Sequence, residues 1–217
     1  MSDASTTPGP HSGRSFDERA ATWDADPTKV SRANAIAAAI ARDVPLSRAM
    51  RALEYGCGTG LVTFALRERV GDVTLADLSD GMLDVVRQKI VATGDVGLHA
   101  AKLDLLADPL PEHRFDVVYS AMTLHHVPDT DAILRRFHAV LARPGWLAIA
   151  DLDAEDGSFH GAGFDGHHGF DRDDLARRTR AAGFAHVRFS TAYEMQKEAA
   201  GAMRTYPIFL MVAGTGA

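Results

Sequence analysis

Hydrophobic positions along the chain follow two periods, and their order predicts strands that alternate with helices. Short apolar runs predict strands at 51–55, 73–77, 96–101, 115–121 and 146–152. Between these runs apolar residues recur every three or four positions, which predicts amphipathic helices. Two β-rich runs, 187–193 and 207–213, close the chain and fit an antiparallel pair. The pattern therefore predicts an α/β fold with a mostly parallel, doubly wound sheet covered by helices on both faces.

Polar residues and glycines mark where the predicted helices begin and end. Asp129 or Thr130 is placed to cap a helix whose apolar face extends to Leu141, and Pro144-Gly145 stops that helix. A helix over 171–182 is predicted to close at Gly183, because glycine favours the position just after a helix.

The composition of the chain changes along its length and suggests its organisation. Residues 1–14 are rich in serine, threonine, proline and glycine, which predicts a flexible tail, and they lack the apolar stretch of a signal peptide. Residues 15–217 are predicted to form a single domain. Within it, 15–45 is predicted to be a helical lid interrupted at Pro27, and 154–170 a glycine-rich loop insertion.

Charge and cysteine content narrow the classes of function. The 217 residues carry 23 basic and 29 acidic side chains, a net charge of −6, so no basic face for nucleic acid is expected. The single cysteine, Cys57, cannot form an internal disulfide, and the most apolar segment, 33–41, is too short to span a bilayer. We expect a cytoplasmic protein that binds neither nucleic acid nor membrane; its oligomeric state stays open.

The strongest chemical pattern is the glycine cluster Gly56-Cys57-Gly58-Thr59-Gly60, directly after the first predicted strand. Glycines allow a sharp turn and a close approach of the backbone to a ligand, and ligands of open α/β sheets bind at the carboxyl ends of strands. A dinucleotide fingerprint needs G-x-G-x-x-G, but Leu61 takes the place of the third glycine. Leu61 therefore counts against a dinucleotide, but a glycine-rich turn by itself does not identify the ligand.

Acidic residues stand at the ends of three successive predicted strands. They are Glu54, Asp77 and Asp104. Asp77 is placed to accept both hydroxyls of a ribose, Asp104 to accept from an adenine amino group, and Glu54 to meet an ammonium group. Together these acids suit a ligand that has a sugar, a base and a positive charge but no phosphate.

This ordered set of motifs resembles the class I S-adenosylmethionine-dependent methyltransferases, in particular the small methyltransferase-domain family of type 11. The resemblance covers 16–213. It rests on 53–60, Asp77, Asp104, Phe115-Asp116-Val117-Val118-Tyr119-Ser120, Leu124-His125-His126-Val127-Pro128-Asp129 and Leu141-Ala142-Arg143-Pro144-Gly145-Trp146. It implies a Rossmann-like sheet of seven strands with an antiparallel last strand. It also implies S-adenosyl-L-methionine as the cofactor and S-adenosyl-L-homocysteine as the product.

The resemblance implies roles for the cofactor residues as well. It gives the ribose to Asp77, the adenine to Asp104 and Leu105, and the methionyl part to the glycine loop, with Cys57 a loop residue rather than a nucleophile. Met82 would pack on the adenine or be an ordinary core residue, and Trp23 would stack near the sulfonium or anchor the lid. The predicted cofactor set is Trp23, Glu54, Gly56, Cys57, Gly58, Gly60, Asp77, Leu78, Met82, Asp104, Leu105 and Ser120.

Two adjacent histidines, His125 and His126, follow the fourth predicted strand and are the candidate catalytic residues. Methyl transfer from a sulfonium depends mainly on alignment, and a base is needed only where the acceptor must lose a proton. An imidazole titrates near neutrality and suits that task. In similar enzymes the first of the pair faces the pocket, so His125 is the predicted base and His126 the structural partner. The alternative is that both only line the pocket.

The glycine-rich loop after the fifth predicted strand carries three more histidines, His160, His167 and His168. A metal site could be built there, but no tight ligand spacing is present, and we predict no metal. We predict instead a mobile loop over the acceptor pocket, in which His167 and His168, with Asp151, contact the substrate. A surface loop with incidental histidines is the alternative.

The sequence thus predicts a methyltransferase acting on a small-molecule acceptor, because little of the chain lies outside the core. Whether the accepting atom is oxygen, nitrogen, sulfur or carbon stays open. A nicotinamide-dependent oxidoreductase is one alternative, opposed by Leu61. A protein that binds S-adenosylmethionine without methylating anything is another, because binding residues and catalytic residues are different sets.

Overall fold

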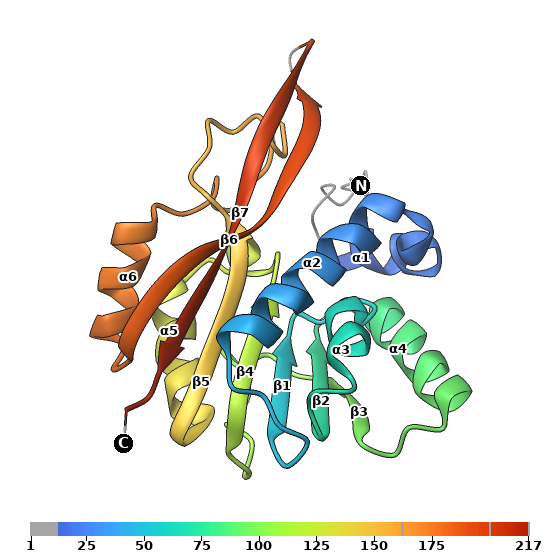
Figure 1. The fold of residues 1–217 in the computed structure, drawn as a ribbon. Helices are drawn as coiled ribbons and strands as arrows, with labels where there is room; N and C mark the ends of the chain where they lie inside the picture. Colours follow the sequence, from blue (N-terminus) through green and yellow to red (C-terminus); the bar gives the residue numbers. More distant parts are fainter. Residues whose placement is uncertain (1–12, 162, 200, 217) are drawn as a thin grey trace, which may run out of the picture.

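The computed structural model describes residues 13–161, 163–199 and 201–216, which form a seven-stranded sheet flanked by helices (Figure 1). The strands are β1 (Arg51–Tyr55), β2 (Asp72–Asp77), β3 (Leu98–Lys102), β4 (Phe115–Ala121), β5 (Leu141–Leu152), β6 (Ala185–Ala199) and β7 (Ala202–Gly214). The helices are α1 (Gly13–Arg19), η1 (Ala20–Ala25), α2 (Pro27–Asp43), α3 (Leu61–Leu66), α4 (Asp80–Thr93), η2 (Leu124–His126), α5 (Thr130–Val140) and α6 (Arg172–Ala181).

The strands lie in the order β3-β2-β1-β4-β5-β7-β6. Strands β1 to β5 pair in parallel with their neighbours, whereas β7 runs antiparallel to both β5 and β6. The predicted Rossmann-like sheet of seven strands with an antiparallel last strand is confirmed. Because the chain order reverses between β1 and β4, their carboxyl ends form the switch point where such sheets bind ligands.

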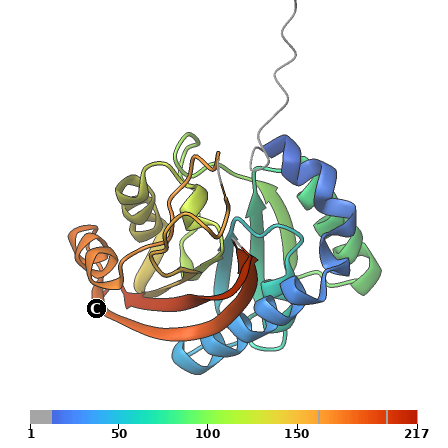
Figure 2. The same ribbon diagram turned by 90° about the horizontal axis from the view of Figure 1, so that it is seen from above.

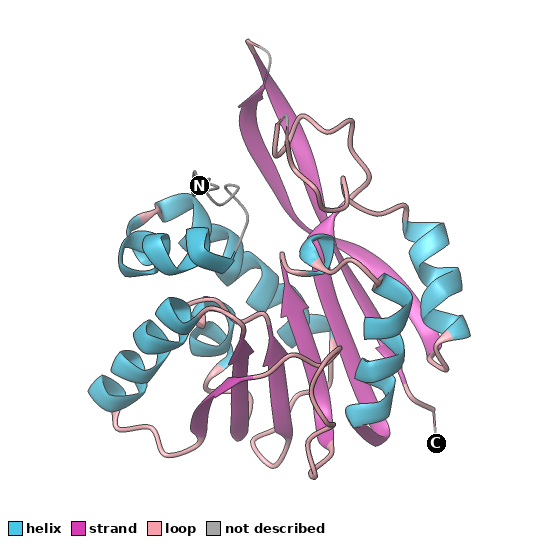
Figure 3. Cartoon of the chain, turned by 180° about the vertical axis from the view of Figure 1, so that it is seen from behind, coloured by secondary structure: helices cyan, strands magenta, loops and turns pink. Residues whose placement is uncertain are grey.

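Helices cover both faces of the sheet (Figure 3). Apolar residues of α2, α3 and α4 share one buried cluster, and those of α5 and α6 share the other. Neighbouring strand residues point to opposite clusters, as Ala52 and Leu53 of β1 do, because side chains alternate along a strand. Both faces of the central strands are therefore buried, which explains why those strands are apolar throughout.

Two element ends differ from the prediction. Strand β3 begins at Leu98, and Val96 is 92% exposed, because the Asp95 side chain accepts the Gly97 N–H at 3.0 Å and forms a tight turn before the strand. Helix α5 ends at Val140, and Leu141 already pairs with Phe115 at the start of β5. The expectation of a helix through Leu141 was wrong because an apolar residue at that position serves either element.

Strands β6 and β7 are much longer than the apolar runs that predicted them. Their outer parts, 194–199 and 202–207, pair with each other beyond the end of β5 and project as a two-stranded ribbon (Figure 1). Residues in this ribbon are mostly polar or partly exposed, so hydrophobic periodicity gives little sign of it. At the base of the ribbon, the Tyr206 hydroxyl lies 2.7 Å from Ser158 Oγ and ties the ribbon to the loop after β5.

The N-terminal helices lie over the carboxyl ends of the strands (Figure 2). Pro27 is the first residue of α2, capped by the Asp26 carboxylate, which accepts the Thr28 N–H at 2.9 Å. The predicted tail ended at residue 14, but α1 already begins at Gly13; residues 1–12 lie outside the described part of the chain. No described helix is long and apolar enough to cross a membrane.

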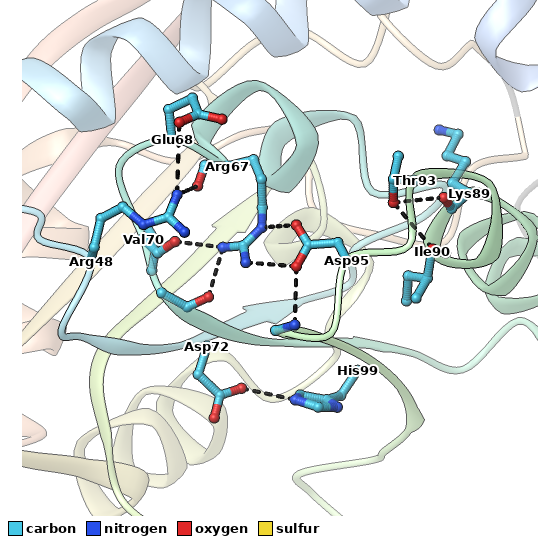
Figure 4. A network of polar contacts seen from close by, with 12 residues as sticks. Arg48, Arg67, Glu68, Val70, Asp72, Lys89, Ile90, Thr93, Asp95 and His99 are labelled. Carbon is cyan, nitrogen blue, oxygen red and sulfur yellow. Dashed lines mark hydrogen bonds and ion pairs between the residues drawn. The ribbon is translucent and has the colours of Figure 1, made fainter.

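A polar network lies at the opposite end of the sheet (Figure 4). Arg67, just after α3, donates to both carboxylate oxygens of Asp95 and to the carbonyl oxygens of Val70 and Gly71. The same ion pair lowers the pKa of Asp95 to about 2. These contacts tie the turn before β2 to the turn before β3, and their residues do not line the cavity at the carboxyl ends of the strands.

Candidate active site

A cavity of about 560 Å³ opens at the carboxyl ends of the strands, under the N-terminal helices. That volume fits a ligand of cofactor or drug size. Its lining includes eight members of the predicted cofactor set. They are Trp23 of η1, Glu54 of β1, the loop residues Gly56, Cys57 and Gly58, and, at the end of β2 and beyond it, Asp77, Leu78 and Met82.

The glycine loop leaves room for a ligand at one specific position. Gly58 has a φ of +52°, and a Cβ there would meet nothing nearer than Met82 Sδ at 4.0 Å, so the space beside it belongs to the cavity. Gly56, at +70°, faces Thr123, whose side chain would lie 2.2 Å from an added Cβ. Glycine is required at Gly56 for packing, whereas at Gly58 it lets the backbone border a ligand.

Glu54 is a buried carboxyl group at the tip of β1. The N–H and hydroxyl of Thr63 donate to its Oε2 at 3.2 and 2.5 Å, and Tyr119 extends the network through Thr63. Burial raises the pKa of Glu54 to about 8, against the smaller opposing effect of these hydrogen bonds. A cationic ligand group beside Glu54 would favour its ionised form, so the chemistry of this position fits an ammonium.

Asp77, at the end of β2, closes the glycine loop. It accepts the Gly58 N–H at 2.7 Å and the Ser79 N–H at 2.9 Å. Burial raises the pKa of Asp77, and these backbone hydrogen bonds offset part of that rise. The carboxylate is therefore fixed in direction at the edge of the cavity, where a ligand hydroxyl could donate to it.

The lid is joined to this end of the cavity by two acids. Asp17 accepts from Ser79 Oγ at 2.5 Å and from the Gly81 N–H at 2.9 Å. Asp24 accepts from Thr59 Oγ1 at 2.5 Å and pairs with Lys89 at 2.5 Å. Trp23, between them, lines the cavity, but the Lys29 ammonium already lies 4.2 Å from its ring centroid.

Four predicted cofactor residues, Gly60, Asp104, Leu105 and Ser120, do not line the cavity. The Asp104 carboxylate accepts the Leu106 N–H at 2.8 Å and so stabilises its own turn. Leu105 is fully buried in the core cluster of α5 and α6, and Ser120 Oγ donates to the Tyr55 carbonyl at 2.8 Å. The contacts of these residues with the cofactor stay predictions.

A buried histidine–aspartate pair lies at the other end of the cavity. His125 Nδ1 is 2.6 Å from Asp151 Oδ1, and both residues are almost fully buried, although His125 also lines the cavity. Burial by itself would raise the pKa of Asp151, but the charge and hydrogen bonds of His125 and the Leu152 N–H lower it overall. An ionised Asp151 accepts from Nδ1–H, so Nε2 of His125 is the nitrogen with a lone pair.

Asp151 was predicted to contact the substrate, but it stands behind His125 and does not line the cavity. His126 was predicted to be structural and turned to the interior. It is instead the more exposed of the two, lines the cavity and meets the Phe16 ring edge-on at 5.5 Å between centroids. The short helix η2 turns both imidazoles toward the same space, which a simple inside–outside alternation does not anticipate.

Of the three histidines in the loop after β5, His160 lines the cavity, whereas His167 and His168 do not. The ring atom Nε2 of His167 lies 3.0 Å from the Val127 carbonyl oxygen, and the backbone N–H of His167 donates to the His125 carbonyl oxygen at 2.8 Å. His167 therefore ties the loop to the turn after β4. His168 is exposed and pairs with Glu155 at 3.4 Å. Neither lines the cavity; Phe159 and His160 do. The predicted substrate contacts of His167 and His168 thus have no support from the cavity lining and stay predictions.

Cationic side chains at the cavity were missed by the sequence reasoning. Lys29, Arg32 and Lys197 line it, from α2 and from the ribbon. Arg32 reaches Met195 Sδ at 3.8 Å, and burial lowers the pKa of its guanidinium. The sequence reasoning missed them because Lys29 and Arg32 lie on a helix without a chemical motif, and Lys197 lies in the outer part of β6, beyond the predicted run 187–193.

Cys57, in the glycine loop, is a buried thiol. Burial raises its pKa, which keeps the thiol neutral and weakly nucleophilic.

Comparisons with known proteins agree with this geometry. Residues 53–149 match the family model described as "Methyltransferase domain". A ubiquinone/menaquinone biosynthesis C-methyltransferase, UbiE, from Shewanella woodyi is 37% identical over 107 residues, which cover 48% of this chain and 43% of that protein. The match thus spans less than half the length of this curated relative.

Two solved structures share the fold. A SAM-dependent methyltransferase from Aquifex aeolicus has a TM-score of 0.67 at 18% identity, covering 92% of this chain and 98% of that one. The [4+2]-cyclase SpnF has a TM-score of 0.65 at 16% identity, covering 85% and 81%. The chain thus has a Rossmann-like fold with a cavity at the carboxyl ends of its strands. Residues 53–149 match a methyltransferase domain, and the chain resembles the class I S-adenosylmethionine-dependent methyltransferases in sequence and in fold.

Proposed function

We propose that this chain transfers the methyl group of S-adenosylmethionine to a small-molecule acceptor. The observation that carries the proposal is one cavity with two chemically different ends. Glu54, Asp77 and the glycine loop border one end, and the His125–Asp151 pair borders the other. When bound, S-adenosylmethionine would supply an electrophilic methyl group on a sulfonium leaving group.

The residues of the first end suit the cofactor. Asp77 would accept the ribose hydroxyls, Glu54 would pair with the ammonium, and the backbone at Gly58 would border the methionyl chain. Residues 15–45 would act as the lid, since Asp17 and Asp24 already join α1 and η1 to the loops after β1 and β2. Closing the cavity would exclude water and align the reacting atoms, an effect that can supply roughly 7–11 kcal/mol.

His125 is the proposed proton acceptor. Its Nδ1 is held by Asp151, so Nε2 faces the cavity and can take a proton from an acceptor hydroxyl. Asp151 would stabilise the imidazolium that results. The relative from Shewanella woodyi is named a C-methyltransferase, and carbon methylation of a hydroxylated ring also needs a base to remove the hydroxyl proton. The proposed acceptor is accordingly a small molecule with an acidic hydroxyl or enol.

The first experiment is a binding comparison by thermal shift with S-adenosylmethionine, S-adenosylhomocysteine, NAD and NADP. At about 100 times Kd a ligand adds roughly 2.7 kcal/mol of stability, on the order of 5–10 °C for a chain of this size. We expect a shift with the first two ligands alone. A shift with NAD or NADP alone would contradict the proposal.

The second experiment measures S-adenosylhomocysteine release with a panel of phenolic and enolic acceptors. The His125→Ala variant is expected to bind the cofactor normally while losing about 10²–10⁴-fold in rate. Full activity in the His125→Ala variant would contradict the assignment of His125 as the base but would not contradict the proposed methyl transfer.

A non-methylating role is the second candidate, favoured by the fold shared with a protein named a [4+2]-cyclase. In that case the chain would bind S-adenosylmethionine, and no acceptor would cause release of S-adenosylhomocysteine. The release assay therefore separates the two functions.

A further inference from the structure

Three imidazole rings from two separate segments converge at the acceptor end of the cavity. His125 and His126 come from η2, and His160 comes from the loop after β5. One ring nitrogen from each lies within 4.8 Å of the others, and the ring centroids of His126 and His160 lie 4.2 and 4.9 Å from that of His125. We propose that these three histidines bind a divalent first-row metal ion, Zn²⁺ foremost.

The donor set fits such an ion. Neutral imidazole is a preferred ligand of Zn²⁺, and zinc sites that act on substrates use three protein ligands and keep a fourth position open. Here the fourth position would face the cavity, which all three histidines line. No other group of three such side chains close enough to share an ion is found among the described residues.

The distances require only a small adjustment. Two nitrogens bound to zinc at about 2.0–2.1 Å in tetrahedral geometry lie about 3.4 Å apart. The present nitrogens are within 4.8 Å, so the rings must move together by about an ångström. His160 lies in the loop after β5, between Gly157 and Gly161, and its ring stacks on Phe164 with 3.8 Å between centroids. Ion binding would therefore shift the His160 and Phe164 rings together.

Asp151 gives His125 the outer partner that metal-bound histidines have. A ligating imidazole almost always donates its second N–H to a carboxylate or carbonyl, which fixes the ring and raises its basicity. The 2.6 Å contact between His125 Nδ1 and Asp151 Oδ1 provides this. With Nδ1 protonated and held by an ionised Asp151, Nε2 keeps the lone pair that a metal needs, and His125 lines the cavity before any ion binds.

The metal site itself does not depend on the proposed methyl transfer, but the role that we give the bound ion rests on that proposed function. A bound ion would hold an acceptor oxygen in its open position and lower the pKa of that hydroxyl. The hydroxyl proton would then pass to solvent water, and His125 would serve as a ligand instead of a base. The two roles of Nε2 exclude each other at any moment, so metal content would decide which one operates.

The test uses the full chain without a histidine tag, stripped of metal and titrated with Co²⁺, a spectroscopic substitute for Zn²⁺. We expect one ion per chain, the visible absorption of tetrahedral Co²⁺, and displacement by Zn²⁺. His126→Gln and His160→Gln should each weaken binding at least about 10-fold, and Asp151→Asn should weaken it about 10–100-fold. His99→Gln, an exposed histidine at the other end of the sheet, is the matched control and should bind normally.

Binding of S-adenosylhomocysteine is measured in parallel for every variant. Normal binding in His160→Gln with lost Co²⁺ binding supports the proposal, because the fold and the cofactor end are then intact. Absence of the tetrahedral spectrum, or Co²⁺ binding unchanged in His126→Gln and His160→Gln, overturns it. Failure to bind S-adenosylhomocysteine in the unaltered chain would instead contradict the proposed function, and the metal titration would still decide the metal site.

Discussion

A histidine–aspartate pair lies at each end of the sheet, and the two pairs share the same side chains but differ in burial. His99 and Asp72 are 3.0 Å apart where β2 and β3 begin, with about half of each side chain exposed (Figure 4). His125 and Asp151 are 2.6 Å apart where β4 and β5 end, and both are buried. Water screens the first pair and makes it weak. Burial makes the second directional, so that one ring nitrogen is committed to Asp151 and the other to the cavity.

The same contrast holds for the acids. At the beginning of β2 and β3 the carboxylate of Asp95 is satisfied by Arg67 and the Gly97 N–H, and its pKa is lowered to about 2. At the cavity Glu54 makes no ion pair within 4.0 Å among the described residues, and burial raises its pKa to about 8. The acid at one end is therefore neutralised by an arginine, whereas the acid at the other end is held only by the uncharged Thr63.

The largest expected effect is on the buried pair. Asp151→Asn should lower methyl-transfer activity of the metal-free protein by about 10²–10⁴-fold, because His125 loses its orienting carboxylate. Asp72→Asn is the matched control and should leave the rate unchanged. Equal rates for Asp151→Asn and the unaltered chain would show that the two pairs are functionally equivalent.

The next effect concerns Glu54. Glu54→Gln should weaken binding of S-adenosylmethionine about 10–100-fold, because a hydrogen bond to a charged group contributes about 1.5–3 kcal/mol. With a pKa of about 8 in the ligand-free chain, Glu54 should release a proton when an ammonium binds at pH 7. Calorimetry in buffers of different ionisation enthalpy measures that proton, which should vanish in Glu54→Gln.

The control for this variant is Glu68→Gln, an exposed acid at the far end of the sheet that should bind the cofactor normally. The ligand-free chain offers a second check. Because the pKa of Glu54 is raised on folding, its contribution to stability should fall as the pH rises from about 4.5 to about 8. Stability curves of Glu54→Gln and the unaltered chain that stay parallel over this range would contradict the assignment.

A smaller effect is expected from the network at the far end. Arg67→Met leaves Asp95 with only the Gly97 N–H as a donor and removes the Arg67 donor from two carbonyl oxygens, which should cost about 1–3 kcal/mol, or about 2–10 °C in Tm. Arg87→Met, which breaks only an exposed pair with Asp84, should cost under about 1 kcal/mol. Affinity for S-adenosylhomocysteine should be unchanged in both, and a lower affinity in Arg67→Met would mean that the two ends are coupled.

The smallest expected effect is a change at low pH in the contribution of Asp95 to stability. Because the pKa of Asp95 falls from 3.8 to about 2 on folding, its stabilising contribution is complete above pH 4 and is lost as the pH falls through 2. The difference in stability between the unaltered chain and Asp95→Asn should therefore narrow across this range, by about 1 kcal/mol or less, since the group is partly exposed. Denaturant melts at pH 4, 3 and 2 measure it, and a constant difference would refute the ion pair as its cause.

Much of the fold could be predicted because its signals are local. The apolar runs of β1 and β4 coincide with the observed strands, and Ser79, Asp129 and Asp171 cap helices where a capping residue precedes an apolar face. The sequence placed the glycine loop, Glu54 and Asp77 at the cavity because the loop directly follows a predicted strand and the two acids stand at predicted strand ends. The outer ribbon of β6 and β7 was missed because its polar residues are held by pairing with each other rather than by a core.

The sequence by itself determined the alternation of strands and helices along the chain and the position of the glycine loop beside Glu54 and Asp77. Only the tertiary structure decided which histidines meet. His160 lies 34 positions after His126 and beyond a whole helix and strand, so no spacing rule relates them, and His167 and His168 were the more conspicuous pair. The same holds for Asp151 behind His125 and for Arg32 and Lys197 at the cavity. Periodicity reports which face of an element is apolar, whereas a site joins side chains from different elements, and their distances exist only once the chain has packed.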